Sequence, residues 1–137
     1  MKAKLSIAAG AALLVAALQA AAAPLPQPIT RNGVTYLNGG IGHDEALAMR
    51  AEARRYPLSI VFSAGKDNEF LADVKVAIKN KAGKQVLSDA AAGPIMLVKL
   101  PAGNYAIAAE RDGMTLHRTV RVGDNGHERV NFHWPSA

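Results

Sequence analysis

Hydrophobic and polar residues alternate along most of the chain from residue 58 onward. The alternating runs are separated, at intervals of roughly 8 to 12 residues, by turns rich in glycine, proline, asparagine and aspartate. This pattern is typical of an all-β sandwich or barrel. Seven strands are expected: residues 58–64, 73–79, 85–89, 95–100, 104–111, 114–122 and 128–134. The run 95–100 is apolar on both faces, which predicts burial on both sides of its sheet.

One helix is expected before these strands, at about residues 44–55. Asp44 is placed to cap its N-terminus, and arginines gather near its end, where they complement the helix dipole. Leu47 lies nearly opposite the main apolar stripe, so the amphipathicity is weak and the helix should lie on the surface of a larger structure. That stripe consists of Ala46, Met49, Ala53 and Tyr56.

Asp112-Gly113, between strands 104–111 and 114–122, is the strongest turn signal in the sequence. This dipeptide favours a two-residue hairpin loop, which pairs Arg111 with Met114 and sets the register of both strands. The apolar residues then fall on a single face. Arg118 falls on that same inward face, opposite Ile107.

Residues 1–22 have the pattern of a secretory signal peptide. Lys2 and Lys4 precede an apolar run, residues 5–18, which is shorter than the about 20 residues of a membrane-spanning helix. Ala20 and Ala22 form an Ala-x-Ala site, so cleavage is expected after Ala22. We therefore expect a periplasmic or secreted protein without a transmembrane segment.

The expected organisation is one small domain behind this leader. Half of the residues are hydrophobic and none is cysteine, so a hydrophobic core rather than disulfides must hold the chain together. The divisions are residues 1–22, signal peptide; 23–29, proline-rich linker; 30–57, N-terminal extension with the helix; and 58–134, β-sandwich.

The charge pattern argues against nucleic-acid binding. Lys2 and Lys4 are two of the 16 basic side chains, so 14 remain after processing against 11 acidic ones. Basic and acidic residues alternate along most segments, whereas a nucleic-acid binder of this size usually carries a basic stripe.

Three segments of the sequence carry a family resemblance. They are residues 56–64, residues 71–78 with the sequence LADVKVAI, and residues 100–107 with the pattern Leu-Pro-x-Gly-x-Tyr-x-Ile. In this order they resemble the carboxypeptidase regulatory-like domains, a branch of the transthyretin-like or prealbumin-like β-sandwiches, over residues 58–134. Residues 32–36 and 39–45 resemble the N-terminal part of small secreted proteobacterial proteins of unknown function that carry such a domain.

The resemblance implies a seven-stranded Greek-key sandwich with an added N-terminal helix, exported to the periplasm. It also implies an accessory module that assists folding or binds partners or small ligands. The enzymatic branch of the fold, the hydroxyisourate hydrolases, ends in Tyr-Arg-Gly-Ser, whereas this chain ends in residues 133–137, HWPSA. The enzymatic activity therefore does not carry over, and fold alone implies none.

Histidines are the first candidates for metal or proton chemistry, but their spacing forms no ready-made site. Met114 and His117 fall on opposite faces of a strand. His117 and His133 become neighbours only if the last two strands pair, whereas the fold more naturally sets the last strand beside strand 58–64. The weak candidates are therefore His117, His127, His133 and Met114, weighed against a role as solvated surface residues. We expect no catalytic residue and no cofactor.

Arg118 is the most unusual residue, because the hairpin register turns it inward and a lone buried charge is costly. One interpretation is a charge at a sheet margin that discourages edge-to-edge association, with its head in water. The other is a buried ion pair with Asp73 or Asp89, or an anion-binding group at the end of the sandwich.

The leading functional hypothesis is a non-enzymatic exported module whose surface or open strand edge binds a protein, peptide or envelope component. One alternative is a periplasmic copper or zinc protein, in which Met49, Met96 or Met114 clusters with a histidine. Another is a small histidine-dependent hydrolase of the transthyretin-like fold, although no serine lies in a nucleophile motif. The identity of the partner and the oligomeric state are left open.

Overall fold

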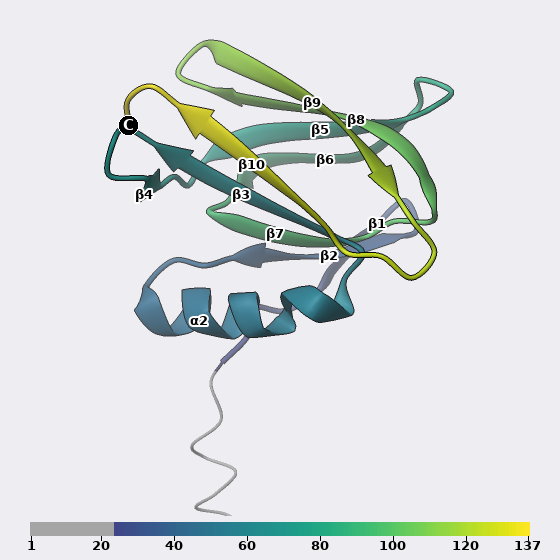
Figure 1. The fold of residues 1–137 in the computed structure, drawn as a ribbon, viewed down its shortest axis with the longest axis horizontal. Helices are drawn as coiled ribbons and strands as arrows, with labels where there is room; N and C mark the ends of the chain where they lie inside the picture. The colour runs from purple at the N-terminus through teal and green to yellow at the C-terminus, as the bar shows by residue number, and fades with distance from the viewer. Residues whose placement is uncertain (1–23) are drawn as a thin grey trace, which may run out of the picture.

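The computed structural model describes residues 24–137, which form two β-sheets packed face to face (Figure 1). Sheet A has the strand order β1-β2-β7-β3-β10, with β4 paired to β3, and sheet B has the order β6-β5-β8-β9. The strands are β1 (Ile29–Arg31), β2 (Val34–Gly39), β3 (Leu58–Ala64), β4 (Glu69–Phe70), β5 (Val74–Asn80), β6 (Gln85–Ala92), β7 (Ile95–Lys99), β8 (Gly103–Arg111), β9 (Met114–Val122) and β10 (Glu128–Trp134). The expected signal peptide, residues 1–22, lies outside the described residues.

All seven expected strands are present, and β3, β9 and β10 have the expected bounds. Strand β6 is longer than expected and continues to Ala92. Three strands are additional: β1, β2 and β4. Because β2 pairs antiparallel with β7, the end of the expected linker and the start of the expected N-terminal extension, residues 29–39, contribute two strands to sheet A.

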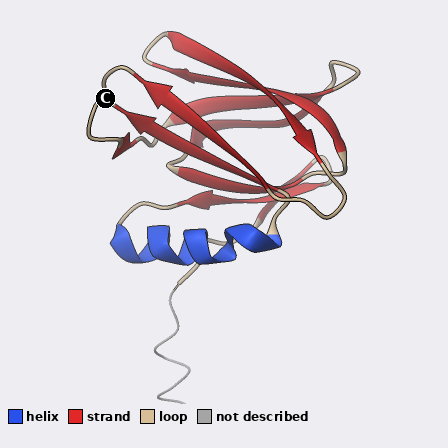
Figure 2. Ribbon diagram, in the orientation of Figure 1, coloured by secondary structure: helices blue, strands red, loops and turns tan. Residues whose placement is uncertain are grey.

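The expected helix is confirmed as α2 (His43–Glu52), which continues into the 3-10 turn η2 (Ala53–Arg55), as Figure 2 shows. The expected cap is wrong: Gly42 occupies the N-cap position, and Asp44 lies in the first turn. The reason is local, since the carboxylate of Glu45 reaches back and accepts a hydrogen bond of 2.8 Å from the backbone N–H of Gly40.

Helix α2 lies on the outer face of sheet A. Its expected apolar stripe, including the buried Met49, packs against Leu37, Ile95 and Leu97 of β2 and β7. The neighbouring residues of β7, Met96 and Val98, point into the space between the sheets. Strand β7 is therefore buried on both sides, as its sequence predicts.

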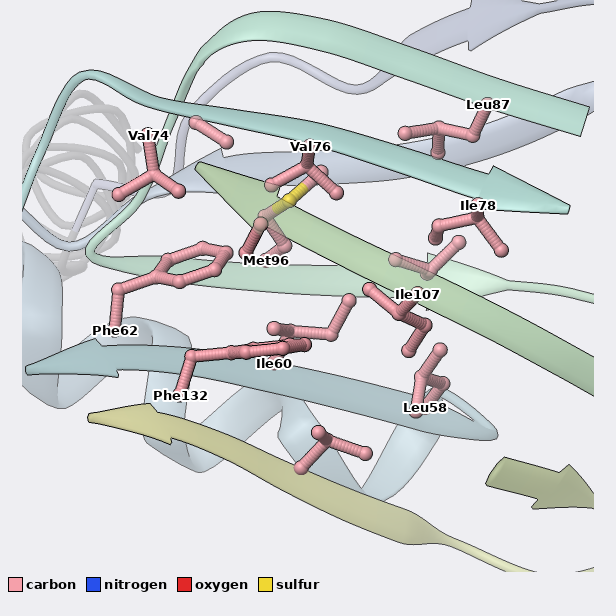
Figure 3. Packing of buried hydrophobic residues seen from close by; sticks show 14 of the residues in the cluster. Leu58, Ile60, Phe62, Val74, Val76, Ile78, Leu87, Met96, Ile107 and Phe132 are labelled. Carbon is pink, nitrogen blue, oxygen red and sulfur yellow. The ribbon is translucent and has the colours of Figure 1, made fainter. Parts of the chain in front are cut away.

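The main core fills the space between the two sheets (Figure 3). Aromatic side chains of β3 and β10 meet there, with ring centroids 5.8 Å apart for Phe62 and Phe132 and 6.3 Å apart for Phe132 and Trp134. The expected inward positions of β10 are confirmed, because Val130, Phe132 and Trp134 are all buried.

The expected hairpin register between β8 and β9 is also confirmed, from Arg111 opposite Met114 to Ile107 opposite Arg118. Asp112 and Gly113 have φ values of 51° and 80°, as a primed turn requires. Among residues 24–137, no helix has the length and apolar character needed to cross a membrane.

Candidate functional site

The two sheets leave two open sides, where edge strands of one sheet face an edge strand of the other. On one side β1 and β2 face β6, and on the other β9 faces β10. The second side, formed by residues 114–122 and 128–134, is called the seam. Nearly all candidate residues from the sequence lie on its two strands, and His127 directly precedes β10.

Side-chain hydrogen bonds close the side opposite the seam. The Tyr36 hydroxyl donates to Asp89 Oδ2 at 2.6 Å, and a guanidinium N–H of Arg31 donates to the carbonyl of Ser88 at 3.1 Å. The Asn38 side chain donates from Nδ2 to the carbonyl of Ala91 at 3.1 Å, and its Oδ1 accepts from the N–H of Gly93 at 2.8 Å. Burial, and then the bond to Asp89, raises the pKa of Tyr36 to about 12.

The seam is only partly closed. Trp134 Nε1 donates to the carbonyl of Met114 at 3.1 Å near the hairpin end. Further along, Arg118 Nη2 donates to the carbonyl of Asn131 at 3.0 Å. Around this second bond the strands leave a groove of about 340 Å³, called the seam groove, which is lined by residues 118–121 of β9 and 128–131 of β10.

Backbone groups of both strands point into the seam. In the hairpin, pairs that exchange hydrogen bonds alternate with pairs that do not, starting from Arg111 and Met114 beside the turn. The N–H and C=O groups of Thr119 and Arg121 therefore point away from β8. On β10, the Glu128 N–H donates to the Pro57 carbonyl at 2.8 Å, so the alternate residues of β10 direct their groups toward β9.

The seam groove carries a local excess of positive charge. Arg118, Arg121 and Arg129 line it together with a single acid, Glu128. All three arginines are exposed, and none forms an ion pair with a carboxylate among the described residues. The groove can therefore offer both hydrogen-bonding backbone and guanidinium groups to a ligand.

The hairpin register places Arg118 on the inner face of sheet B. The residue lies at the margin of that sheet, however, and its guanidinium group reaches solvent. Its hydrogen-bond partner is a backbone carbonyl rather than a carboxylate. Asp89 lies on the opposite side of the sandwich, bonded to Tyr36 and 4.0 Å from Arg31, so it is not the partner of Arg118. Asp73 forms no ion pair within the described part of the chain.

The weak metal candidates fall in different places. His117 lies on β9 in sheet B and His133 on β10 in sheet A, because the last strand pairs with β3, as expected. Met114 and His117 lie on opposite faces of β9. In residues 24–137, no three histidine or carboxylate side chains are close enough to share a metal ion.

The structure also forms two serine–histidine contacts that the sequence analysis missed. Ser63 Oγ and His133 Nδ1 are 2.9 Å apart, directly across the β3–β10 pairing. His127 Nδ1 lies 2.7 Å from the Tyr56 carbonyl, which fixes its proton there and leaves Nε2 facing Ser59 Oγ at 3.4 Å. The parallel register of β3 and β10 would have revealed the Ser63 contact.

These pairs have the spacing of a nucleophile and a base, but no carboxylate among residues 24–137 hydrogen-bonds to either histidine. Ser59 is also only 4% exposed, beneath α2. The His127 contacts join the end of the helical segment to β3 and to the start of β10. Of the sites that contain candidate residues from the sequence, the seam groove is the one with the clearest capacity to bind a ligand. No protein-family model and no curated protein matches this sequence.

Proposed function

We propose that the protein is a non-enzymatic binding module that takes up an extended acidic segment of another protein in the seam groove. The segment adds as a strand along the open edge of β9, where the backbone groups of Thr119 and Arg121 point away from β8. One observation carries this proposal: two edge strands that direct backbone groups into the seam line the same groove as three arginines that lack a carboxylate partner among the described residues.

Strand addition uses the backbone of the seam. An extended peptide hydrogen-bonds to an open sheet edge through its main chain, while its alternate side chains supply specificity. The opposite side of the sandwich is a poorer edge, because Arg31, Tyr36 and Asn38 already bridge it. The seam has only two such bridges, from Trp134 and Arg118.

The arginines select the charge of the partner. Acidic side chains spaced along a strand would approach Arg118, Arg121 and Arg129 with complementary charge, which favours both encounter and register. A second copy of this chain would bring the same arginines to the seam. Like-charge repulsion therefore disfavours self-association through this edge.

Export and family membership belong to the same proposal. Export is supported by the N-terminal pattern of residues 1–22, and the carboxypeptidase regulatory-like assignment by residues 56–64, 71–78 and 100–107. The seven-stranded Greek-key arrangement of the transthyretin-like sandwiches is compatible with two facing sheets. In this role the module would act on a periplasmic or secreted partner.

The proposal is tested by fluorescence anisotropy with a labelled heptapeptide of alternating glutamate and valine. The same peptide with lysine in place of glutamate should not bind. N-methylation at every second residue removes backbone donors on one edge, and should weaken binding by about tenfold or more. Equal binding of the N-methylated peptide would exclude strand addition.

Two variants locate the binding to the seam. Arg118→Gln combined with Arg129→Gln should weaken binding of the glutamate peptide by about a hundredfold, since each removes one charge-assisted contact. Arg54→Gln is the matched control, because Arg54 is exposed on η2 and does not line the seam groove. An equal loss of binding in the control would show non-specific attraction to positive charge.

A further inference from the structure

A second groove gathers most of the exposed large hydrophobic side chains. Ile41, Leu47 and Phe70 are 69%, 51% and 39% exposed, and only Leu25 and Met114 are comparable among residues 24–137. Ile41, Leu47 and Phe70 all line a groove of about 450 Å³ between the N-terminal half of α2 and strand β4. Exposed apolar surface concentrated in one concave place is typical of a binding site.

Helix α2 contributes one wall of this groove with a stripe of its own. His43, Leu47 and Arg50 follow each other at helical spacing and line the groove together. The helix therefore uses two faces, one packed on sheet A through Met49 and one open to the groove. This explains why its hydrophobic residues do not form a single stripe.

The ionisable side chains that line the groove are basic. His43 and Arg50 line it, and no carboxylate does. Arg50 lies over the ring of Phe70, with its guanidinium carbon 5.3 Å from the ring centroid, and forms no ion pair within the described part of the chain. The nearby Glu45 carboxylate is engaged by the N–H of Gly40.

We propose that this groove binds a single-chain amphiphile with an apolar tail and a carboxylate head, in the class of medium-chain fatty acids. The tail lies on Ile41, Leu47 and Phe70, and the carboxylate pairs with Arg50. The groove volume of about 450 Å³ falls within the range of small-molecule sites. The site is separate from the seam groove and does not depend on peptide binding there.

The test is an NMR titration of the isotope-labelled protein with decanoate below its micelle concentration. Amide shifts should concentrate in residues 40–50 and around Phe70. Arg50→Gln should weaken decanoate binding by about tenfold, the loss of one charge-assisted pair, and leave binding of decanol unchanged. Arg54→Gln, at the end of the same helical segment, should bind decanoate normally.

Leu47→Asn separates the tail contact from the head contact, because it should weaken decanoate and decanol together. Thermal unfolding of each variant shows that it remains folded. Decanoate binding that is unaffected by Arg50→Gln, or amide shifts scattered over both sheets, would overturn the proposal. A short peptide ending in two leucines that shifts the same amides at lower concentration than decanoate would also overturn it, in favour of a protein C-terminus.

Discussion

Tyr36 of β2 and Asp89 of β6 join the two sheets through a hydrogen bond of 2.6 Å inside the sandwich. Both residues are buried, with 0% and 8% exposure. The contact is strong because its acceptor is a carboxylate with little access to water. It bridges the side of the sandwich opposite the seam. That side therefore has less capacity than the seam to accept a further strand.

Tyr36→Phe should destabilise the protein by about 1–3 kcal/mol, because it leaves the buried Asp89 carboxylate without its hydroxyl donor. The free energy of unfolding in urea measures this loss. Tyr105→Phe is the matched control, since the Tyr105 hydroxyl donates to a neutral carbonyl, that of Pro101, at 2.7 Å. A loss no larger than in this control would show that the Asp89 contact adds nothing specific.

The same contact predicts a stability change at alkaline pH. Burial raises the pKa of Tyr36 from 10.0 to about 12, so the folded state holds its proton more tightly than the unfolded state. Its contribution of about 2–3 kcal/mol is present below pH 10 and is lost as the pH rises from about 10 to 12. Thermal unfolding across this range should show the loss.

Tyr36→Phe should have a flatter profile over the same pH interval. A slope will remain, because burial also raises the pKa of Tyr56 and Tyr105. Identical pH profiles for the original protein and the variant would contradict the assignment to Tyr36. Tyrosinate absorbance provides a second reading, in which one tyrosine fewer titrates late in the variant.

Local signals in the sequence were sufficient for the hairpin. The two-residue turn at Asp112-Gly113 leaves one register that places the apolar residues on a single face, and that register forms. The burial of β7 on both sides was equally readable, because a strand without a polar face needs cover on both sides. In the structure α2 supplies that cover.

Asp112→Pro should destabilise the protein by about 3 kcal/mol or more. Proline holds φ near −65°, whereas Asp112 has a φ of 51° in the turn. Asp112→Asn should be tolerated, because asparagine enters the left-handed region readily. Urea unfolding of both variants measures the difference, and equal stability would mean that the loop accommodates a different turn.

The features that the sequence did not predict depend mainly on pairing between segments far apart in the chain. Strand β2 is not among the strands expected from the sequence, and its place beside β7 depends on contacts between residues more than 50 positions apart in the chain. The seam groove depends in the same way on β9 and β10 facing each other from different sheets. The Asp44 cap failed because Glu45, one residue later, bonds with the preceding loop.

Export can be tested directly. Expression of the full chain in a bacterium with a periplasm should yield a periplasmic product whose mass corresponds to cleavage after Ala22. Ala20→Arg should block cleavage, because the Ala-x-Ala site requires small side chains, and the precursor should then accumulate. Lys66→Arg, far from that site, is the control. An uncleaved cytoplasmic product from the original sequence would contradict export.

Trp134→Ala should cost about 3–5 kcal/mol, because it removes a large side chain from the packed core. Trp134 is 3% exposed, and its ring lies 6.3 Å from the rings of Phe62 and Phe132. Its indole N–H also bridges the seam to the carbonyl of Met114. The free energy of unfolding in urea measures the loss, and a cost below about 1 kcal/mol would place Trp134 outside the cooperative core.

Trp134→Phe separates packing from the seam bridge. Phenylalanine keeps much of the aromatic surface but lacks the donor to Met114, so the net loss of that bond, about 1 kcal/mol, adds to the packing deficit left by the smaller ring. If the bridge helps to hold β9 against β10, hydrogen exchange should accelerate at Met114 and its neighbours more than at β5. Uniform acceleration across both sheets would instead indicate that Trp134 acts only through the core, and the seam would then be held near the groove by Arg118.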